Sequence, residues 1–256
     1  MSNYITPKIT LIGAGPGDVE LITVKGVNAL QTANVVLYDA LVNKELLQYA
    51  PKAAVKIYVG KRNHEHAYNQ FQINTLIVDM AYTYGHVVRL KGGDSFVFGR
   101  GQEEINYAKI FNIDTTVIPG ISSSISVPAL AGIPVTHRGV SESFWVITGT
   151  TKDNQLSQDV SLAAKTNATV VILMGLGKLK EIVEIFVAEG KEDTAIALIQ
   201  DGSLPTQKVA LGTIETIVSI AQEKNIAAPA VIVIGEVVKQ QSNFESILNN
   251  YQFLSN

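Results

Sequence analysis

Arginine and histidine are confined to one part of this sequence. Every arginine and all four histidines fall between positions 62 and 138, whereas lysines are spread along the whole chain. A guanidinium group grips a carboxylate or phosphate through two parallel hydrogen bonds, which a lysine ammonium cannot do. The segregation favours a local site for an anion, and chance placement of surface arginines beside surface acids is the alternative. The arginines are Arg62, Arg89, Arg100 and Arg138.

A glycine-rich turn after the first expected strand invites comparison with dinucleotide-binding folds. Residues 13–18 read Gly-Ala-Gly-Pro-Gly-Asp, and Asp39 ends the next expected strand. The dinucleotide fingerprint needs a third glycine where this chain has Asp18, and Pro16 removes a backbone N–H from the turn that would hold a pyrophosphate. An NAD-dependent oxidoreductase is therefore disfavoured. The turn suits a ligand other than a diphosphate.

Further glycine-rich turns follow other expected strands, and Lys, Arg or Asp stand beside several of them. In an open parallel sheet, ligands bind at the carboxyl ends of the strands. One such turn could be purely structural, because glycine is also the residue for left-handed backbone. Together they predict a binding edge. The turns span 59–62, 90–94, 118–120 and 173–175.

The elements that position these turns alternate between short β-branched runs and longer amphipathic segments, which is typical of βα units. We expect strands at 8–13, 34–39, 55–59, 87–91 and 115–118, with helices at 20–33, 42–49, 70–84 and 102–111. In the second half we expect strands at 144–148, 169–174, 195–200, 208–211 and 230–234. The turn-rich segment 201–205 predicts an antiparallel hairpin, so the second sheet should be mixed.

Pro/Gly breaks at 118–120 and 132–139 flank an expected helix at 122–131 and mark the domain junction. The prediction is two α/β domains, residues 1–119 with a mostly parallel sheet and residues 120–256 with a mixed one. A length of 256 residues with 46% hydrophobic residues suffices for two compact cores.

Composition excludes several classes of protein. A net charge of −3 disfavours nucleic-acid binding, because neutralising phosphates needs a basic face. The chain has no cysteine, which removes disulfides, thiolate nucleophiles and Cys-type zinc sites. No apolar run approaches the ~20 residues of a membrane helix, and no secretory signal is visible. We therefore expect a cytoplasmic protein without a membrane or nucleic-acid partner.

Three long motifs resemble the tetrapyrrole (class III) methyltransferases, and the resemblance runs nearly end to end. They are the turn at 13–18, the segment 35–42 and the segment 87–101. Residues 59–62 followed by His66, Gln70 and Ile73-Asn74, together with 131–138, resemble the members of that family that methylate uroporphyrinogen III. Methyltransferases that act on later precorrins of the cobalamin pathway are the closer competitors. A non-catalytic tetrapyrrole-binding protein is a third alternative.

The resemblance implies a homodimer that methylates uroporphyrinogen III at C2 and C7, giving precorrin-2 via precorrin-1, for sirohaem or cobalamin. S-adenosylmethionine would bind in the cleft between the two domains, without a metal. Asp39 would accept a proton and Lys61 would donate one. Arg100 would be a third catalytic residue and would line the substrate mouth together with Glu103, His137 and Arg138. The implied cofactor-binding residues are Pro16, Gly92, Gly93, Asp94, Val97, Ser122, Ser123, Met174, Gly202 and Ala230.

Some of these residues also have ordinary structural interpretations. Asp39 could cap the helix expected at 42–49, and Met174 could be a core residue at a strand end. His64 and His66 have the alternate spacing of metal ligands, but no third ligand accompanies them. The chain departs from the family pattern at Ser95, where proline is usual, and at Thr150, where histidine is common. A fused dehydrogenase–chelatase would need well over 100 more residues, so we expect a monofunctional enzyme.

Overall fold

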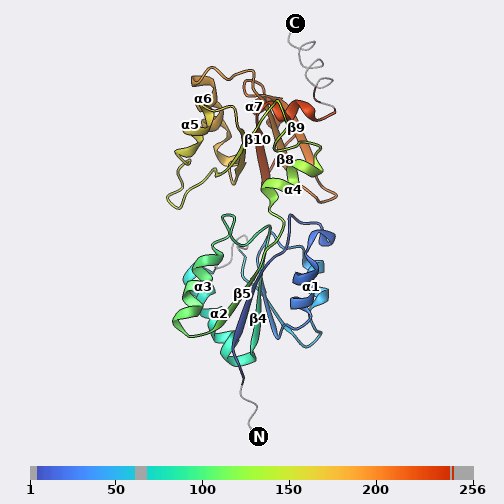
Figure 1. The fold of residues 1–256 in the computed structure, drawn as a ribbon, viewed down its shortest axis with the longest axis vertical. Helices are drawn as coiled ribbons and strands as arrows, with labels where there is room; N and C mark the ends of the chain where they lie inside the picture. Colours follow the sequence, from blue (N-terminus) through green and yellow to red (C-terminus); the bar gives the residue numbers. More distant parts are fainter. Residues whose placement is uncertain (1–4, 61–67, 243, 245–256) are drawn as a thin grey trace. The chain divides into compact units, whose positions relative to one another are not determined.

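The computed structural model describes residues 5–60, 68–242 and 244. The chain divides into two compact units, Met1–Ser122 and Ser123–Asn256, each built around its own five-stranded sheet (Figure 1). None of the helices in the described part of the chain combines the length and apolar character that a membrane span requires.

The first unit contains a fully parallel sheet in the order β3-β2-β4-β1-β5. Its central strands are buried on both faces and, apart from Arg89 and Lys91 in β4, are mainly apolar and rich in β-branched residues, as parallel strands are. The prediction of a mostly parallel first sheet is confirmed. The strands are β1 (Lys8–Gly13), β2 (Val35–Tyr38), β3 (Val55–Tyr58), β4 (His86–Lys91) and β5 (Asp114–Ile118).

Helices cover both faces of this sheet (Figure 1). On one face α1 (Val24–Leu30) and the 3₁₀ helix η2 (Lys44–Tyr49) pack against Ile12, Val36 and Val88. On the other face α2 (Gln70–Tyr84) and α3 (Gly101–Ile110) pack against the alternate strand residues. Neighbouring strands β1 and β4 send their connections to opposite faces. That makes their carboxyl ends the switch point where open α/β sheets bind ligands.

Two helix predictions in this unit were wrong in detail. The helix expected at 20–33 is broken into a 3₁₀ turn, η1 (Val19–Leu21), and the short α1. Asp18 and Thr23 each accept a backbone N–H, from Glu20 and Gly26, so the chain starts a helix twice. The helix expected at 42–49 is the 3₁₀ helix η2.

The second unit contains the predicted mixed sheet, in the order β6-β7-β10-β8-β9. Strands β6 and β7 are parallel, whereas β10 runs antiparallel to both β7 and β8. Strands β8 and β9 form the hairpin expected around residues 201–205. The strands are β6 (Phe144–Thr148), β7 (Thr169–Leu173), β8 (Ala195–Gln200), β9 (Lys208–Thr213) and β10 (Ala230–Ile234).

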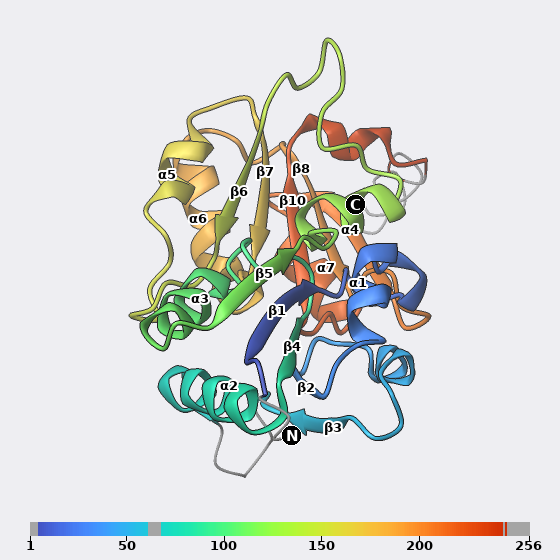
Figure 2. The same cartoon turned by 60° about the horizontal axis from the view of Figure 1, so that its bottom comes forward.

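Helices again cover both faces of the second sheet (Figure 2). On one face α5 (Asp159–Ala164), α6 (Leu179–Ala188) and α7 (Ile217–Glu223) enclose a core of Ile, Leu and Val side chains. On the other face α4 (Ser123–Leu130) and the 3₁₀ helix η4 (Glu236–Gln240) cover the alternate residues. A further 3₁₀ turn, η3 (Leu176–Lys178), leads from β7 into α6.

Candidate functional site

Three loops meet at the carboxyl edge of the first sheet, after β1, β4 and β5. Gly15 and Gly93 exchange two backbone hydrogen bonds, with N–O distances of 3.1 and 2.7 Å. A Cβ at Gly120 would lie 2.3 Å from the Gly93 carbonyl oxygen and 2.6 Å from the Gly13 Cα. Only glycine allows the three backbones to approach this closely. Of the predicted cofactor residues, this edge holds Pro16, Gly92, Gly93, Asp94, Val97 and Ser122.

The Asp94 carboxylate ties these loops together. Its Oδ1 accepts the Phe96 backbone N–H at 2.8 Å, and its Oδ2 accepts the Gly120 N–H at 2.9 Å. A carboxylate offers about four acceptor positions, so each oxygen keeps capacity for a ligand donor. Asp94 therefore shapes the edge and can still receive a hydroxyl or amino group there.

The segment from Asp94 to Gly101 is held in an unusual conformation. Phe98 and Arg100 adopt positive φ angles of 54° and 60°, which side-chain-bearing residues seldom do. A Cβ at Gly99 would lie 2.6 Å from the Ser95 carbonyl oxygen, and that oxygen also accepts the Gly101 N–H. Ser95 is buried, and its hydroxyl has no hydrogen-bond partner within the described residues. The departure from proline thus places an unpaired hydroxyl under the loop.

Arg100 and Glu103 form a paired, half-exposed group at the start of α3. The Arg100 Nε donates to Glu103 Oε1 at 2.8 Å, and Nη2 donates to Oε2 at 2.6 Å. This pairing raises the pKa of Arg100 and lowers the pKa of Glu103. A guanidinium has five N–H groups, so three remain for a second anion. The side chains are 52% and 53% exposed.

Asp39 lies just past β2, at the same edge. Its Oδ1 accepts the Leu41 N–H at 3.2 Å, and its Oδ2 accepts a hydrogen bond from Arg89 at 3.4 Å. The helix-capping interpretation of Asp39 is wrong, because Asn43 caps η2 by accepting the Glu45 N–H. The carboxylate is about a quarter exposed, which leaves it accessible to a ligand.

Arg89 is not available as an anion anchor, so the arginine-rich segment is not one uniform site. Arg89 is 3% exposed, and each of its nitrogens donates to an acceptor of the protein. Its main partner, Glu104, also binds Lys91 at 3.0 Å. This buried cluster was not among the features expected from the sequence. The available signal was that Arg89 and Lys91 alternate with apolar residues along a central strand.

The second unit gathers three predicted cofactor residues at one sheet edge. Because β10 is antiparallel to β7 and β8, its first residue, Ala230, lies at the carboxyl ends of those strands. Met174 follows β7 with a φ of 57° and is 54% exposed, so the core interpretation of this methionine is wrong. Thr150 donates to the Met174 carbonyl at 2.9 Å. Gly202 packs beneath α4, where a Cβ would lie 2.4 Å from Val127.

Ser123, another predicted cofactor residue, is the first residue of α4 in the same unit. His137 and Arg138 lie at the amino edge of the second sheet, opposite the carboxyl edge that holds Met174. The His137 N–H donates to the Ser141 carbonyl, and the Ser141 hydroxyl accepts the N–H of Thr169, the first residue of β7. The side chains of His137 and Arg138 are both exposed. The structure thus separates this pair from Met174 and the other residues at the carboxyl edge.

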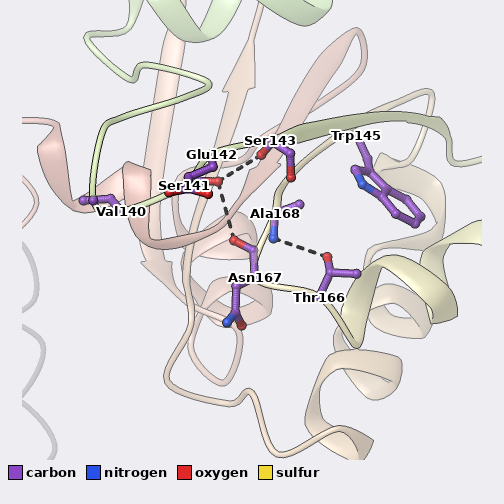
Figure 3. A pocket seen from close by; sticks show the side chains of 9 residues that line it. Val140, Ser141, Glu142, Ser143, Trp145, Thr166, Asn167 and Ala168 are labelled. Atoms are coloured by element: carbon purple, nitrogen blue, oxygen red, sulfur yellow. Dashed lines mark hydrogen bonds between the residues drawn. The ribbon is translucent and has the colours of Figure 1, made fainter.

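Beside His137 and Arg138 lies a surface hollow lined by residues 139–143, Trp145 and 166–168 (Figure 3). Polar groups that line the hollow form hydrogen bonds with one another. The Ser141 hydroxyl donates to the carbonyls of Ser143 and Asn167, and the Thr166 hydroxyl accepts the Ala168 N–H. These bonds hold the turns before β6 and β7 together. Apart from His137 and Arg138 next to it, the hollow contains no predicted site residue.

Some predicted residues lie outside the described part of the chain. Lys61, the predicted proton donor, is among them, as are Arg62, His64 and His66. Within residues 5–60, 68–242 and 244, no group of three or more His, Cys, Asp or Glu side chains could hold a metal ion.

Comparison with known proteins assigns the chain to a family. Residues 8–218 match the family model of the tetrapyrrole (corrin/porphyrin) methylases. A uroporphyrinogen-III C-methyltransferase of Methanocaldococcus jannaschii is 49% identical over 91% of this chain and 98% of its own length. A sirohaem synthase of Nitrosomonas europaea is 41% identical over 92% of this chain, which spans about half of that relative (50%). The crystal structure of a uroporphyrin-III C-methyltransferase from Thermus thermophilus, complexed with S-adenosylhomocysteine, superposes with a TM-score of 0.78 at 34% identity, covering 91% of this chain and 99% of that one. On sequence and fold alike, the chain belongs to the tetrapyrrole methylases.

Proposed function

We propose that this chain transfers methyl groups from S-adenosylmethionine to uroporphyrinogen III, first at C2 and then at C7, giving precorrin-2 via precorrin-1. The observation that carries the proposal is the 49% identity with the uroporphyrinogen-III C-methyltransferase of M. jannaschii, because it extends over 98% of that enzyme. The Thermus relative, which was crystallised with the demethylated product of the methyl donor, supports the same donor here.

The residues of the chain fit such a donor. A sulfonium nucleoside needs hydrogen-bond acceptors for its ribose and amino groups, close backbone approach, and an apolar wall. In the first unit, Asp94 keeps acceptor capacity beside Gly92 and Gly93. In the second, Met174 presents an exposed thioether held by a strained backbone, and a soft, adaptable side chain suits a sulfonium ligand. When bound, the donor supplies an electrophilic methyl group.

Asp39 is the proposed proton acceptor of the reaction. An electron-rich pyrrole β-carbon attacks the methyl group in line, the methyl–sulfur bond breaks, and S-adenosylhomocysteine leaves with the electron pair. The macrocycle must then lose a proton. Asp39 lies at the carboxyl edge of the first sheet, partly exposed and anchored on both oxygens, which is the placement that a general base needs. Lys61 remains the proposed proton donor.

Arg100 is the proposed anchor of the substrate. Uroporphyrinogen carries acetate and propionate arms, so it is a polyanion at neutral pH. The three N–H groups of Arg100 that Glu103 leaves free can receive one such carboxylate in the bidentate geometry that arginine favours. Glu103 is then a positioning partner at the mouth of the site. His137 and Arg138 stay predictions as substrate contacts, as do the homodimer and the cytoplasmic location.

Binding and product mass together test this function. Calorimetry should detect S-adenosylmethionine and S-adenosylhomocysteine but not NAD, because Pro16 and Asp18 disrupt the dinucleotide turn. Mass spectrometry of a reaction with enzymatically made uroporphyrinogen III should show the gain of one and then two methyl groups. NAD binding without heat from the methyl donor would contradict the methyltransferase proposal. Activity on later corrin intermediates alone would contradict the substrate. Porphyrinogen binding without a mass gain would indicate a non-catalytic binding protein.

A further inference from the structure

Four charged side chains form a continuous cluster inside the first unit, behind Asp39. Glu104, on α3, sits between two cations of β4. Its Oε1 lies 3.2 Å from Arg89 Nε and 3.0 Å from Lys91 Nζ. Gln70, on α2, also donates to this oxygen at 3.3 Å. Arg89 in turn reaches Asp39, so one chain of contacts connects the buried helix to the proposed base.

Burial makes this arrangement costly, so it needs a reason. The side chain of Glu104 is 1% exposed, and those of Arg89 and Lys91 are 4% and 7% exposed. Apart from Gln70 and Asn74 of α2, the face around them is lined by apolar residues such as Val87 and Ile105. An aliphatic trio of similar volume would pack there without the penalty of removing charges from water. Stability alone therefore does not account for the cluster.

The contact with Asp39 supplies such a reason. Among the charged side chains of the cluster, which all lie in the described part of the chain, Asp39 alone is partly exposed, and Arg89 links it to the buried members. The Arg89 guanidinium is held on three sides: Nε by Glu104, Nη1 by the carbonyls of Leu37 and Leu90, and Nη2 by Asp39. Glu104 holds Nε and is the one fully buried carboxylate among these acceptors. The formal charges of the four side chains also balance, because Glu104 and Asp39 offset Arg89 and Lys91.

We propose that Glu104 is a positioning residue for Asp39 and acts through Arg89. This role rests on the proposed function, in which Asp39 accepts the proton that the macrocycle releases. With Glu104 in place, Arg89 restrains Oδ2 of Asp39 and orients Oδ1, which accepts only the Leu41 N–H among the described residues, toward the sheet edge.

Lys91 completes the cluster by balancing the second negative charge. Burial lowers the pKa of Lys91, and so does the neighbouring Arg89, while Glu104 and Asp39 act in the opposite direction. Removing the Glu104 carboxylate would therefore leave two buried cations facing each other near Asp39 and disturb both. This is why the helix residue, two contacts away from the base, should affect the chemical step.

A double-mutant cycle tests the proposal. Glu104→Gln keeps the size of the side chain and removes the charge that holds Arg89. We expect kcat for methyl transfer to fall by about 10- to 100-fold, as for other groups that orient a catalytic residue, with KM for uroporphyrinogen III and the affinity for S-adenosylmethionine within about three-fold of wild type. In an Asp39→Asn background, the same substitution should cost less than about two-fold more, because residues that act as one unit are not additive.

Glu181→Gln is the matched control. It makes the same chemical change in an ion pair of similar length, 2.9 Å to Lys178, but in an exposed position of the second unit. Its kcat should equal that of wild type. If Glu104→Gln does not fold, Gln70→Met removes another donor to the same oxygen and keeps all four charges. It should then show a milder loss of kcat with the same dependence on Asp39.

The outcomes separate the two proposals. An active wild type in which the Glu104 and Asp39 losses multiply would overturn the positioning role and leave the proposed function intact. Unchanged kcat in a folded Glu104→Gln protein would do the same. A wild-type protein that transfers no methyl group to uroporphyrinogen III would contradict the proposed function, and the role of Glu104 in that reaction would fall with it.

Discussion

Replacing Arg100 with lysine should weaken catalysis on uroporphyrinogen III without weakening the binding of S-adenosylmethionine. The substitution keeps the positive charge but removes the planar fork. It introduces no new backbone strain, because arginine and lysine are equally strained by the φ of 60° at this position. A side chain held where glycine would fit best is a feature that clusters at functional sites.

The magnitude follows from the contacts and the exposure. A charge-assisted hydrogen bond contributes about 1.5–3 kcal/mol, but Arg100 is half exposed, so solvent screening reduces the value. We expect a loss of about 1–2 kcal/mol in transition-state stabilisation, which is roughly 5- to 30-fold in kcat/KM. Lysine can still meet Glu103 as a point charge, so the fold should be unaffected.

Steady-state kinetics of the purified Arg100→Lys protein measures this loss. Thermal unfolding should give a Tm close to that of wild type, and calorimetry should give an unchanged Kd for S-adenosylmethionine. A folded variant with the kcat/KM of wild type would refute the reasoning, because an exposed structural arginine tolerates lysine.

Three further predictions concern stability. Gly120→Ala forces a Cβ to within 2.3 Å of the Gly93 carbonyl, so calorimetric unfolding should show a loss of about 1–3 kcal/mol; Gly177→Ala, where nothing lies within 4 Å, is the control and should change stability by less than about 0.5 kcal/mol. Burial lowers the pKa of His86 in the folded protein below 6.5. As the pH falls, His86 of the unfolded chain is therefore protonated before His86 of the folded protein. The free energy of unfolding should decrease as the pH falls from 6.5 through the folded-state pKa. Denaturant unfolding of His86→Asn should therefore show a smaller loss than wild type on acidification, and an equal loss would contradict this. Burial also lowers the pKa of Lys91 in the folded protein. The wild type should therefore gain stability relative to Lys91→Met as the pH rises from the folded-state pKa of Lys91 toward 10.5. A parallel pH dependence of the two proteins' stabilities would argue against this.

The architecture could be predicted because local patterns decide it. Continuous β-branched runs mark the doubly covered strands of the first sheet, and the turn at 201–205 marks the β8–β9 hairpin. The glycine turns at the carboxyl ends were readable for the same reason, since close backbone approach leaves glycine as the one suitable residue.

The partners that Arg89 and Lys91 find in the buried cluster could not be predicted from the sequence, because they depend on tertiary contacts. Nothing near Arg89 in the sequence shows that its partner, Glu104, comes from the following helix while Arg100 points to solvent. By contrast, the strand expected at 144–148 already follows His137 and Arg138 in the sequence, which puts both residues at the amino edge of the second sheet. The break between η1 and α1 depended on competing caps, which local propensity does not rank.

The most direct test of the account is to locate the transferred methyl groups. Uroporphyrinogen III incubated with the protein and S-adenosylmethionine carrying a ¹³C-labelled methyl group should yield precorrin-2, with nuclear magnetic resonance showing two labelled methyl groups, at C2 and C7. Label at other ring carbons, or none on the macrocycle while S-adenosylmethionine still binds, would contradict it.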